Sequence, residues 1–157
     1  MSDLTVKLNW NGGMKFTGVN ASGLETAIDG DKQSGASPVE LLLEALGACV
    51  SIDVVVILEK SRTPTTKLAV TLEGDRHQPE PRYLTEARML FDVWGAGISP
   101  GKLARAIKLS IGKYCSVYHS LRADLKFRPQ FRIHATGADA SGDYQSVEMA
   151  PTTRELQ

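Results

Sequence analysis

Apolar and polar residues alternate near the amino terminus, and this pattern predicts a half-buried strand over residues 4–10. Residues 11–13, Asn-Gly-Gly, have the composition of a hairpin turn. The alternation resumes over residues 14–18, which predicts the return strand, and residues 24–28 predict a third short strand. A polar, glycine-containing loop over residues 30–36 then leads to a different pattern.

A long helix is predicted to begin after Ser37. The Ser37 hydroxyl can cap the first turn, Pro38 suits the first helical position, and Glu40 completes a Ser-x-x-Glu capping box. Pro64 disfavours helical geometry in the residue before it, so we expect the helix to end near residues 62–63.

The apolar residues of this helix point in all directions around its axis, which predicts a central helix covered on most sides. A membrane span needs about 18 to 20 apolar residues with few charges. Four acidic residues interrupt the stretch: Glu40, Glu44, Asp53 and Glu59. We therefore expect a core helix and no membrane partner.

Alternation returns after the helix. Residues 68–72 and residues 83–93 predict two strands joined by a loop over residues 74–81. The longer strand carries charged residues on one face, which predicts an antiparallel sheet with water on one side. Those charged residues are Arg82, Glu86, Arg88 and Asp92.

The last third of the chain predicts two further helices and a strand. Ser99 and Pro100 mark the start of a helix that ends near Tyr114, and residues 117–125 suit a short further helix. Residues 125–134 alternate as a final strand interrupted by Pro129.

The predicted class is α+β. The chain has 157 residues, so one domain is expected, over residues 1–135. Residues 136–157 are mostly small or polar and predict a carboxy-terminal tail that is ordered only if it packs on a neighbour.

Charge and targeting signals narrow the possible partners. Lys plus Arg and Asp plus Glu both total 18, and no long basic run is present, which argues against a nucleic-acid partner. The first residues lack the pattern of a secretory signal, so we expect a cytoplasmic protein. Its two cysteines are then expected to be reduced, buried or redox-active.

Cys49 and Cys115 are the side chains with obvious redox chemistry, but they form no Cys-x-x-Cys motif. A cysteine on an apolar helix is most often a small core residue, so the residues alone leave both interpretations open. The three histidines, at positions 77, 119 and 134, fall in separate predicted elements. A zinc site needs three or four convergent ligands, so we expect no metal, although His119 follows Cys115 by one helical turn.

Two carboxylates near the thiols have alternative explanations. The capping box alone explains Glu40. Asp53 lies one turn beyond Cys49, where its charge would raise a thiol pKa, so it needs either a basic partner or a place at the helix surface.

The sequence from Ser37 to Cys49, SPVELLLEALGAC, resembles a motif of the OsmC and organic hydroperoxide resistance superfamily. Residues 51–55, SIDVV, and residues 113–117, KYCSV, continue the resemblance. The likeness is greatest to the branch of small OsmC-like proteins and extends from the first hairpin to about Ala135.

This resemblance implies an intertwined homodimer in which antiparallel sheets wrap around long central helices. It implies thiol-dependent reduction of an organic hydroperoxide in the oxidative stress response. Cys49 would attack the peroxide and Cys115 would resolve the resulting sulfenic acid as a disulfide. A dithiol or a lipoylated protein would restore both thiols, and no cofactor is implied. Glu40 is the third candidate catalytic residue.

The chain departs from the peroxidases of the superfamily at two positions. Those proteins carry a glutamate directly after the proline and an amino-terminal arginine that pairs with it and with the reactive thiolate. Here Val39 follows Pro38, no arginine precedes Arg62, and Lys15 is the one cation of the second predicted strand. The alternative function is therefore a non-enzymatic OsmC-like dimer that binds a small apolar ligand. A general disulfide reductase would need the missing Cys-x-x-Cys motif.

Overall fold

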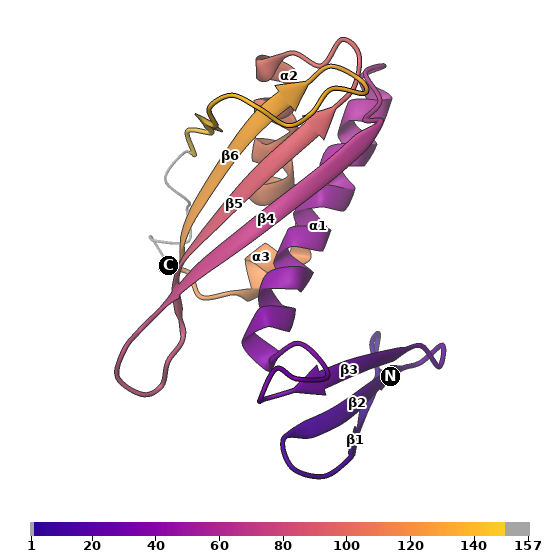
Figure 1. Ribbon diagram of the computed structural model, residues 1–157, viewed down its shortest axis with the longest axis vertical. Coiled ribbons are helices and arrows are strands. Elements are labelled where there is room, and N and C mark those ends of the chain that lie inside the picture. Colours follow the sequence, from indigo (N-terminus) through magenta and orange to yellow (C-terminus); the bar gives the residue numbers. More distant parts are fainter. Residues whose placement is uncertain (1, 150–157) are drawn as a thin grey trace. The chain divides into compact units, whose positions relative to one another are not determined.

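The computed structural model describes residues 2–149 (Figure 1). The chain divides into two compact units, residues 1–42 and residues 43–157. The long helix α1, Pro38–Lys60, begins in the first unit and continues in the second.

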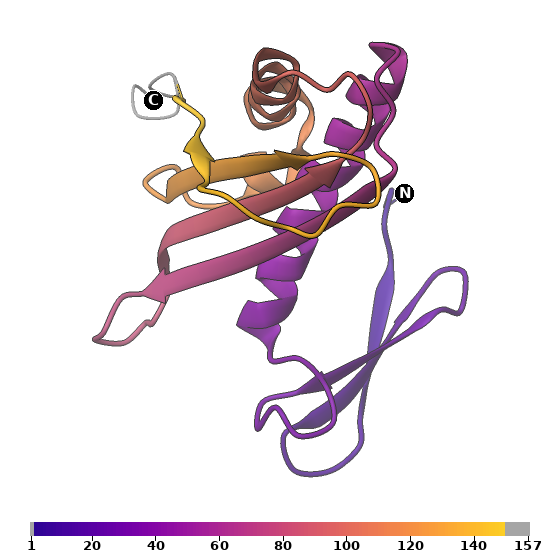
Figure 2. The ribbon, with the colours of Figure 1, turned by 45° about the horizontal axis from the view of Figure 1, so that its top comes forward.

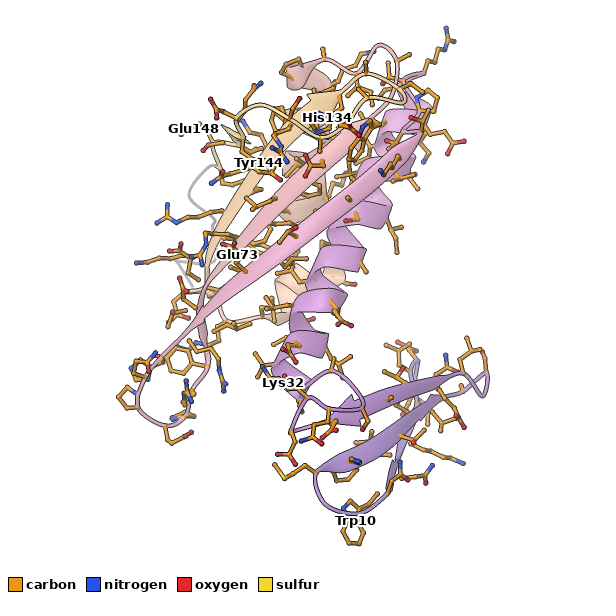
Figure 3. The ribbon with its side chains drawn as sticks, in the orientation of Figure 1. Trp10, Lys32, Glu73, His134, Tyr144 and Glu148 are labelled. Atoms are coloured by element: carbon orange, nitrogen blue, oxygen red, sulfur yellow. The ribbon has the colours of Figure 1, made fainter. Side chains whose placement is uncertain are left out.

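The first unit contains the three predicted strands, which form one antiparallel sheet in the order β1-β2-β3. Their bounds are Val6–Trp10 for β1, Lys15–Asn20 for β2 and Glu25–Asp29 for β3. In this register Trp10 lies opposite Phe16, and Leu8 lies opposite Gly18. The alternation therefore places Leu8 and Trp10 on one face, and both are more than 60% exposed within the single chain, as Trp10 illustrates in Figure 3.

The loop between β3 and α1 is organised by Asp29, which is fully buried. Its carboxylate accepts hydrogen bonds from the amides of Asp31, Gln33 and Ser34 and from the Ser34 hydroxyl. These bonds, the Ser34 hydroxyl foremost, lower the pKa of Asp29. The Asp29 carboxylate thus accepts hydrogen bonds from loop amides that have no partner in the sheet. These bonds fix the conformation of the loop that leads into α1.

Helix α1 begins with the predicted capping box. The Glu40 carboxylate accepts from the Ser37 amide at 2.8 Å and from its hydroxyl at 2.7 Å, and the Glu40 amide donates to the Ser37 hydroxyl. The helix ends at Lys60, slightly before the predicted end. Arg62 has a φ of 59°, a left-handed conformation that ends the helix before Pro64 can.

The second unit contains a four-stranded sheet in the order β4-β5-β6-β7. The bounds are Lys67–Arg76 for β4, Leu84–Trp94 for β5, Lys126–His134 for β6 and Gln145–Ser146 for β7. Strands β4 and β5 are antiparallel, as predicted, but β5 and β6 are parallel. The long helical connection between them permits this pairing, because parallel neighbours need a crossover that returns the chain to the same end of the sheet.

Strand β6 runs through Pro129 without interruption, so the predicted break there is wrong. The Pro129 carbonyl accepts from the Val147 amide and therefore points away from β5. Its nitrogen points the same way, so the missing amide proton costs no hydrogen bond to β5.

The crossover from β5 to β6 contains the predicted second helix in two parts. Helix α2, Pro100–Leu109, is capped by the Ser99 hydroxyl, which accepts from the Lys102 amide. A π-helical turn, η1, follows over Ser110–Tyr114, and helix α3 covers only Ser116–Ser120. Figure 2 shows these helices on the same face of the sheet as α1.

The core of the second unit lies between that face and the helices. Strand β5 contributes Ala87, Met89, Phe91 and Val93, and α1 contributes Leu46, Val50, Val54 and Leu58, all of them fully buried. Gly47 lets α1 approach β4 closely, because a side chain there would collide with Leu72.

The prediction that α1 is covered on most sides is wrong for the single chain. Only one stripe of the helix is buried, since the sheet covers one face, whereas Ile52 is 64% exposed and Val56 is 40% exposed. Among the described residues, α1 is long and apolar enough to cross a membrane, a property that core helices of globular proteins share.

The opposite face of the sheet carries a polar cluster of Asp92, Arg132, His134 and Tyr144 (Figure 3). The Asp92 carboxylate accepts from Arg132 at 2.8 and 3.2 Å, from Tyr144 at 2.7 Å, and lies 2.7 Å from Nε2 of His134. Residues 136–149, which belong to the predicted tail, thus pack on β6 through Tyr144 and β7; residues 150–157 lie outside the described residues.

Candidate functional site

The two cysteines, which are 66 positions apart in the sequence, lie together in the second unit. Cys49 is in the middle of α1 and is partly exposed, whereas Cys115 directly follows η1 and is fully buried. The Cys115 thiol is within hydrogen-bond reach of the Cys49 sulfur. Both are free thiols in this structure, so the site holds a reduced cysteine pair.

The environment of Cys115 favours its protonated form. Burial foremost, then the hydrogen bond with Cys49 and the charges of Cys49 and Asp53, raise the pKa of Cys115 to about 12, although the hydrogen bond from the Tyr118 amide opposes them. At neutral pH Cys115 is therefore a thiol rather than a nucleophilic thiolate. Cys49 is the more exposed cysteine of the pair.

The π-helical turn η1 sets the position of Cys115. The Cys115 amide donates to the Ser110 carbonyl at 2.8 Å, closing the wide turn. The Cys115 sulfur then accepts from the Tyr118 amide at 3.3 Å and so caps α3. A ring nitrogen of His119 lies 2.9 Å from the Ile111 carbonyl, which it can satisfy as a donor. Backbone bonds on both sides thus fix this sulfur.

Asp53 is half-buried and has a neutral hydrogen-bond partner, whereas the sequence suggested either a basic partner or a place at the helix surface. The Ser110 hydroxyl donates to the Asp53 carboxylate at 2.7 Å. Ser110 is fully buried, and it belongs to the same turn that positions Cys115. Sequence reasoning missed Ser110, because no local pattern links it to a residue 57 positions earlier.

Glu40, the third candidate, lies in the first unit and has a cationic partner that the sequence did not suggest. Lys32, in the loop before α1, places its ammonium group 2.8 Å from the Glu40 carboxylate (Figure 3). The hydrogen bond from Lys32, followed by those from Ser37, lowers the pKa of Glu40 to about 2. Glu40 is therefore ionised at neutral pH and is engaged by the cap and by Lys32.

The histidines remain apart, as their predicted elements suggested. His77 stacks on Tyr83, His119 contacts η1, and His134 belongs to the Asp92 cluster on the other face of the sheet. Among residues 2–149, no group of three or more His, Cys, Asp or Glu side chains is placed to hold a metal ion.

Residues 30–130, which include Glu40 and both cysteines, match the family described as OsmC-like protein. The chain belongs to the OsmC-like family. Its relatives include Protein YhfA of Escherichia coli (strain K12), which is 38% identical over 133 residues, covering 84% of this chain and 99% of YhfA.

Solved structures show the same OsmC-like fold. A hypothetical protein from Aquifex aeolicus VF5 is 26% identical, with a TM-score of 0.77 over 86% of this chain and 98% of its own. An organic hydroperoxide resistance protein from Elizabethkingia anophelis is 14% identical, with a TM-score of 0.63 over 85% of this chain and 98% of its own. At that identity the second likeness concerns the fold alone.

The arrangement in this OsmC-like chain permits two-electron thiol chemistry. One sulfur is accessible, a second is held protonated beside it, and the bonds of η1 and α1 maintain the pair. A neighbouring pair of this kind can be oxidised to a disulfide, with the loss of two electrons.

Proposed function

We propose that this OsmC-like protein reduces organic hydroperoxides with its two thiols and serves the oxidative stress response in the cytoplasm. The observation that carries the proposal is the contact between the accessible Cys49 and the buried Cys115. The family membership and the fold shared with an organic hydroperoxide resistance protein support it.

In the first step the Cys49 thiolate attacks the terminal oxygen of the hydroperoxide. A sulfur–oxygen bond forms as the oxygen–oxygen bond breaks, and the departing alkoxide takes up a proton to become an alcohol. Cys49 becomes a sulfenic acid, having lost two electrons to the peroxide.

In the second step Cys115 resolves the sulfenic acid. Its sulfur attacks the Cys49 sulfur, the sulfur–oxygen bond breaks, and the hydroxide leaves with the Cys115 proton as water. Oxidation of Cys49 removes the negative charge that helps to raise the pKa of Cys115, so Cys115 becomes easier to deprotonate only after the first step. A dithiol or a lipoylated protein then supplies two electrons and two protons and restores both thiols.

Glu40 completes the proposed set of catalytic residues. Glu40 forms a salt bridge with Lys32 at the start of the helix that carries Cys49. Lys32 lies in the loop before α1, whereas Lys15, the cation noted in the sequence, lies in the second strand.

The proposed active form is a homodimer. Members of the OsmC-like family are typically dimers. The single chain exposes large apolar side chains on two elements: Ile52 and Val56 on α1, and Val6, Leu8 and Trp10 on β1. A second copy that covers α1 would remove the apolar side chains of its exposed face from water.

Ile52→Glu is expected to convert the dimer to a monomer, because a charge would be buried without a partner at the interface. We expect the dimer dissociation constant to rise by about a hundredfold or more in sedimentation experiments. Thr71→Glu, which adds the same charge at an exposed residue of β4, is the matched control and should leave the dimer intact. A monomeric parent, or a dimeric Ile52→Glu variant, would contradict the proposed assembly.

The direct test of the proposed reaction is the free-thiol count and intact mass of reduced protein after one equivalent of cumene hydroperoxide. We expect both thiols to disappear, with a mass decrease of about two daltons per chain as two hydrogens are lost. Either cysteine variant should abolish this product. Two intact thiols in excess peroxide would sink the proposal and favour an OsmC-like dimer that binds a small apolar ligand.

A further inference from the structure

Ser110 bridges the two segments that carry the thiols. Its carbonyl accepts from the Cys115 amide at 2.8 Å, and its hydroxyl donates to the Asp53 carboxylate at 2.7 Å. Asp53 is one helical turn beyond Cys49 on α1, so it lies on the same side of the helix as that cysteine. One buried serine therefore holds the backbone of one thiol and the helix of the other.

From these contacts we infer that Ser110 and Asp53 are positioning residues, a clamp that keeps Cys49 and Cys115 in the arrangement from which their disulfide forms. The inference rests on the proposed function, because it concerns the second step of that reaction. It assigns a role to two residues that touch neither the peroxide nor the reacting sulfur atoms.

The bond has the properties that a clamp requires. A hydrogen bond to a carboxylate is stronger than one between neutral groups, and the donor of this bond, Ser110, is completely buried. Ser110 also starts the π-helical turn, whose wide closure brings the Cys115 amide back to the Ser110 carbonyl. Movement of Ser110 would therefore move Cys115 with it.

We infer that the clamp raises the effective concentration of one thiol at the other. Two thiols react with each other at a rate and an equilibrium set by the fraction of time they spend in the reactive arrangement. Without the Ser110 hydroxyl, η1 and α1 keep their own backbone bonds but lose this tie between them. The reduced protein would then visit the reactive arrangement less often, whereas the disulfide form is held together by its own covalent bond.

The test measures the disulfide equilibrium with glutathione, so its result does not depend on peroxide reduction. Two protein thiols and one glutathione disulfide give the protein disulfide and two glutathione thiols. Ser110→Ala should lower this equilibrium constant by about tenfold, which corresponds to a rise in reduction potential of about 30 mV. Ser110→Thr, which restores the hydroxyl, should remain within about threefold of the parent.

Further variants separate position from charge and from a general loss of stability. Asp53→Ala should match Ser110→Ala, whereas Asp53→Asn keeps an acceptor for the Ser110 hydroxyl and should remain within about threefold of the parent. Ser120→Ala removes a serine hydroxyl that bonds only within α3, at 2.8 Å from the Ser116 carbonyl, and should leave the equilibrium unchanged.

Three results would overturn the clamp: a change below about threefold for Ser110→Ala, equal losses for Asp53→Asn and Asp53→Ala, or an equal loss for Ser120→Ala. These results can be told apart from a failure of the proposed peroxidase reaction. A protein that ignores cumene hydroperoxide but shows the expected glutathione pattern retains the clamp and lacks the peroxidase reaction. A protein that consumes peroxide with an unchanged equilibrium for Ser110→Ala has the reaction without the clamp.

Discussion

Cys49→Ser is expected to slow the consumption of cumene hydroperoxide by about a thousandfold or more, because a hydroxyl cannot replace a thiolate as the nucleophile. Cys115 is not expected to take over the attack, since it is completely buried, and burial, the largest cause of its raised pKa, persists in the variant. The measurement is the loss of hydroperoxide at limiting concentration with a dithiol reductant present. A far-ultraviolet circular dichroism spectrum like that of the parent would show that the variant is folded.

Cys115→Ser is the matched variant, and it should fail at a different step. Serine preserves the cap of α3, because its oxygen can accept from the Tyr118 amide as the Cys115 sulfur does. In the Cys115→Ser variant, Cys49 should consume one equivalent of peroxide at a rate close to that of the parent. The reaction should then stop, with Cys49 left as a sulfenic acid. That acid can be trapped by a cyclic diketone and detected by mass. Equal loss of the first turnover in both variants would contradict the assignment of attack and resolution.

The fold could be predicted where the physical signal is local. The capping box at Ser37 and Glu40 and the turn after Trp10 depend on residues within one or two turns of each other, and both are present in the structure. The parallel pairing of β5 with β6 has no such local signature, because it depends on where the helical connection returns the chain. The effect of Pro129 is likewise not set by its residue type alone, because it depends on which neighbouring strand its nitrogen faces.

The candidate site was predicted only in part for the same reason. The two cysteines are chemically distinctive, so sequence could nominate them, but their contact is a property of how η1 returns to α1. Ser110 and Lys32 are ordinary residues whose importance comes from a carboxylate partner. Lys32 reaches Glu40 through a loop that the buried Asp29 shapes, and no periodic pattern reports such a contact.

Asp92→Asn is expected to destabilise the protein by about 2 to 4 kcal/mol at neutral pH, because it removes the charge that faces two basic side chains. His134 and Arg132 have side chains that are only 3% and 20% exposed, so water cannot fully replace the lost carboxylate. The variant also weakens the Tyr144 bond that fastens residues 136–149 to the sheet. Urea denaturation at pH 7 measures the free energy of unfolding.

Asp124→Asn provides the control, since it makes the same substitution at another aspartate that pairs with an arginine. Asp124 and Arg122 are 65% and 52% exposed, and surface pairs of this kind contribute about 0 to 1 kcal/mol. The difference between the two variants therefore isolates the effect of burial. Equal stability losses for Asp92→Asn and Asp124→Asn would show that the Asp92 cluster contributes no more to stability than an exposed ion pair does.

The difference in the free energy of unfolding between the parent and Asp92→Asn should depend on pH. The side chains around Asp92 determine the direction of this dependence. Burial raises the pKa of Asp92, but the hydrogen bonds from Arg132, His134 and Tyr144 outweigh it and lower the pKa from 3.8 to about 2. A carboxyl with a lower pKa in the folded state stabilises the protein above its unfolded pKa, and this contribution is lost as the pH falls through the folded value. The parent should thus lose about 2 kcal/mol relative to Asp92→Asn between pH 5 and pH 2. A difference that stays constant over that range would mean that the Asp92 charge does not hold the cluster together.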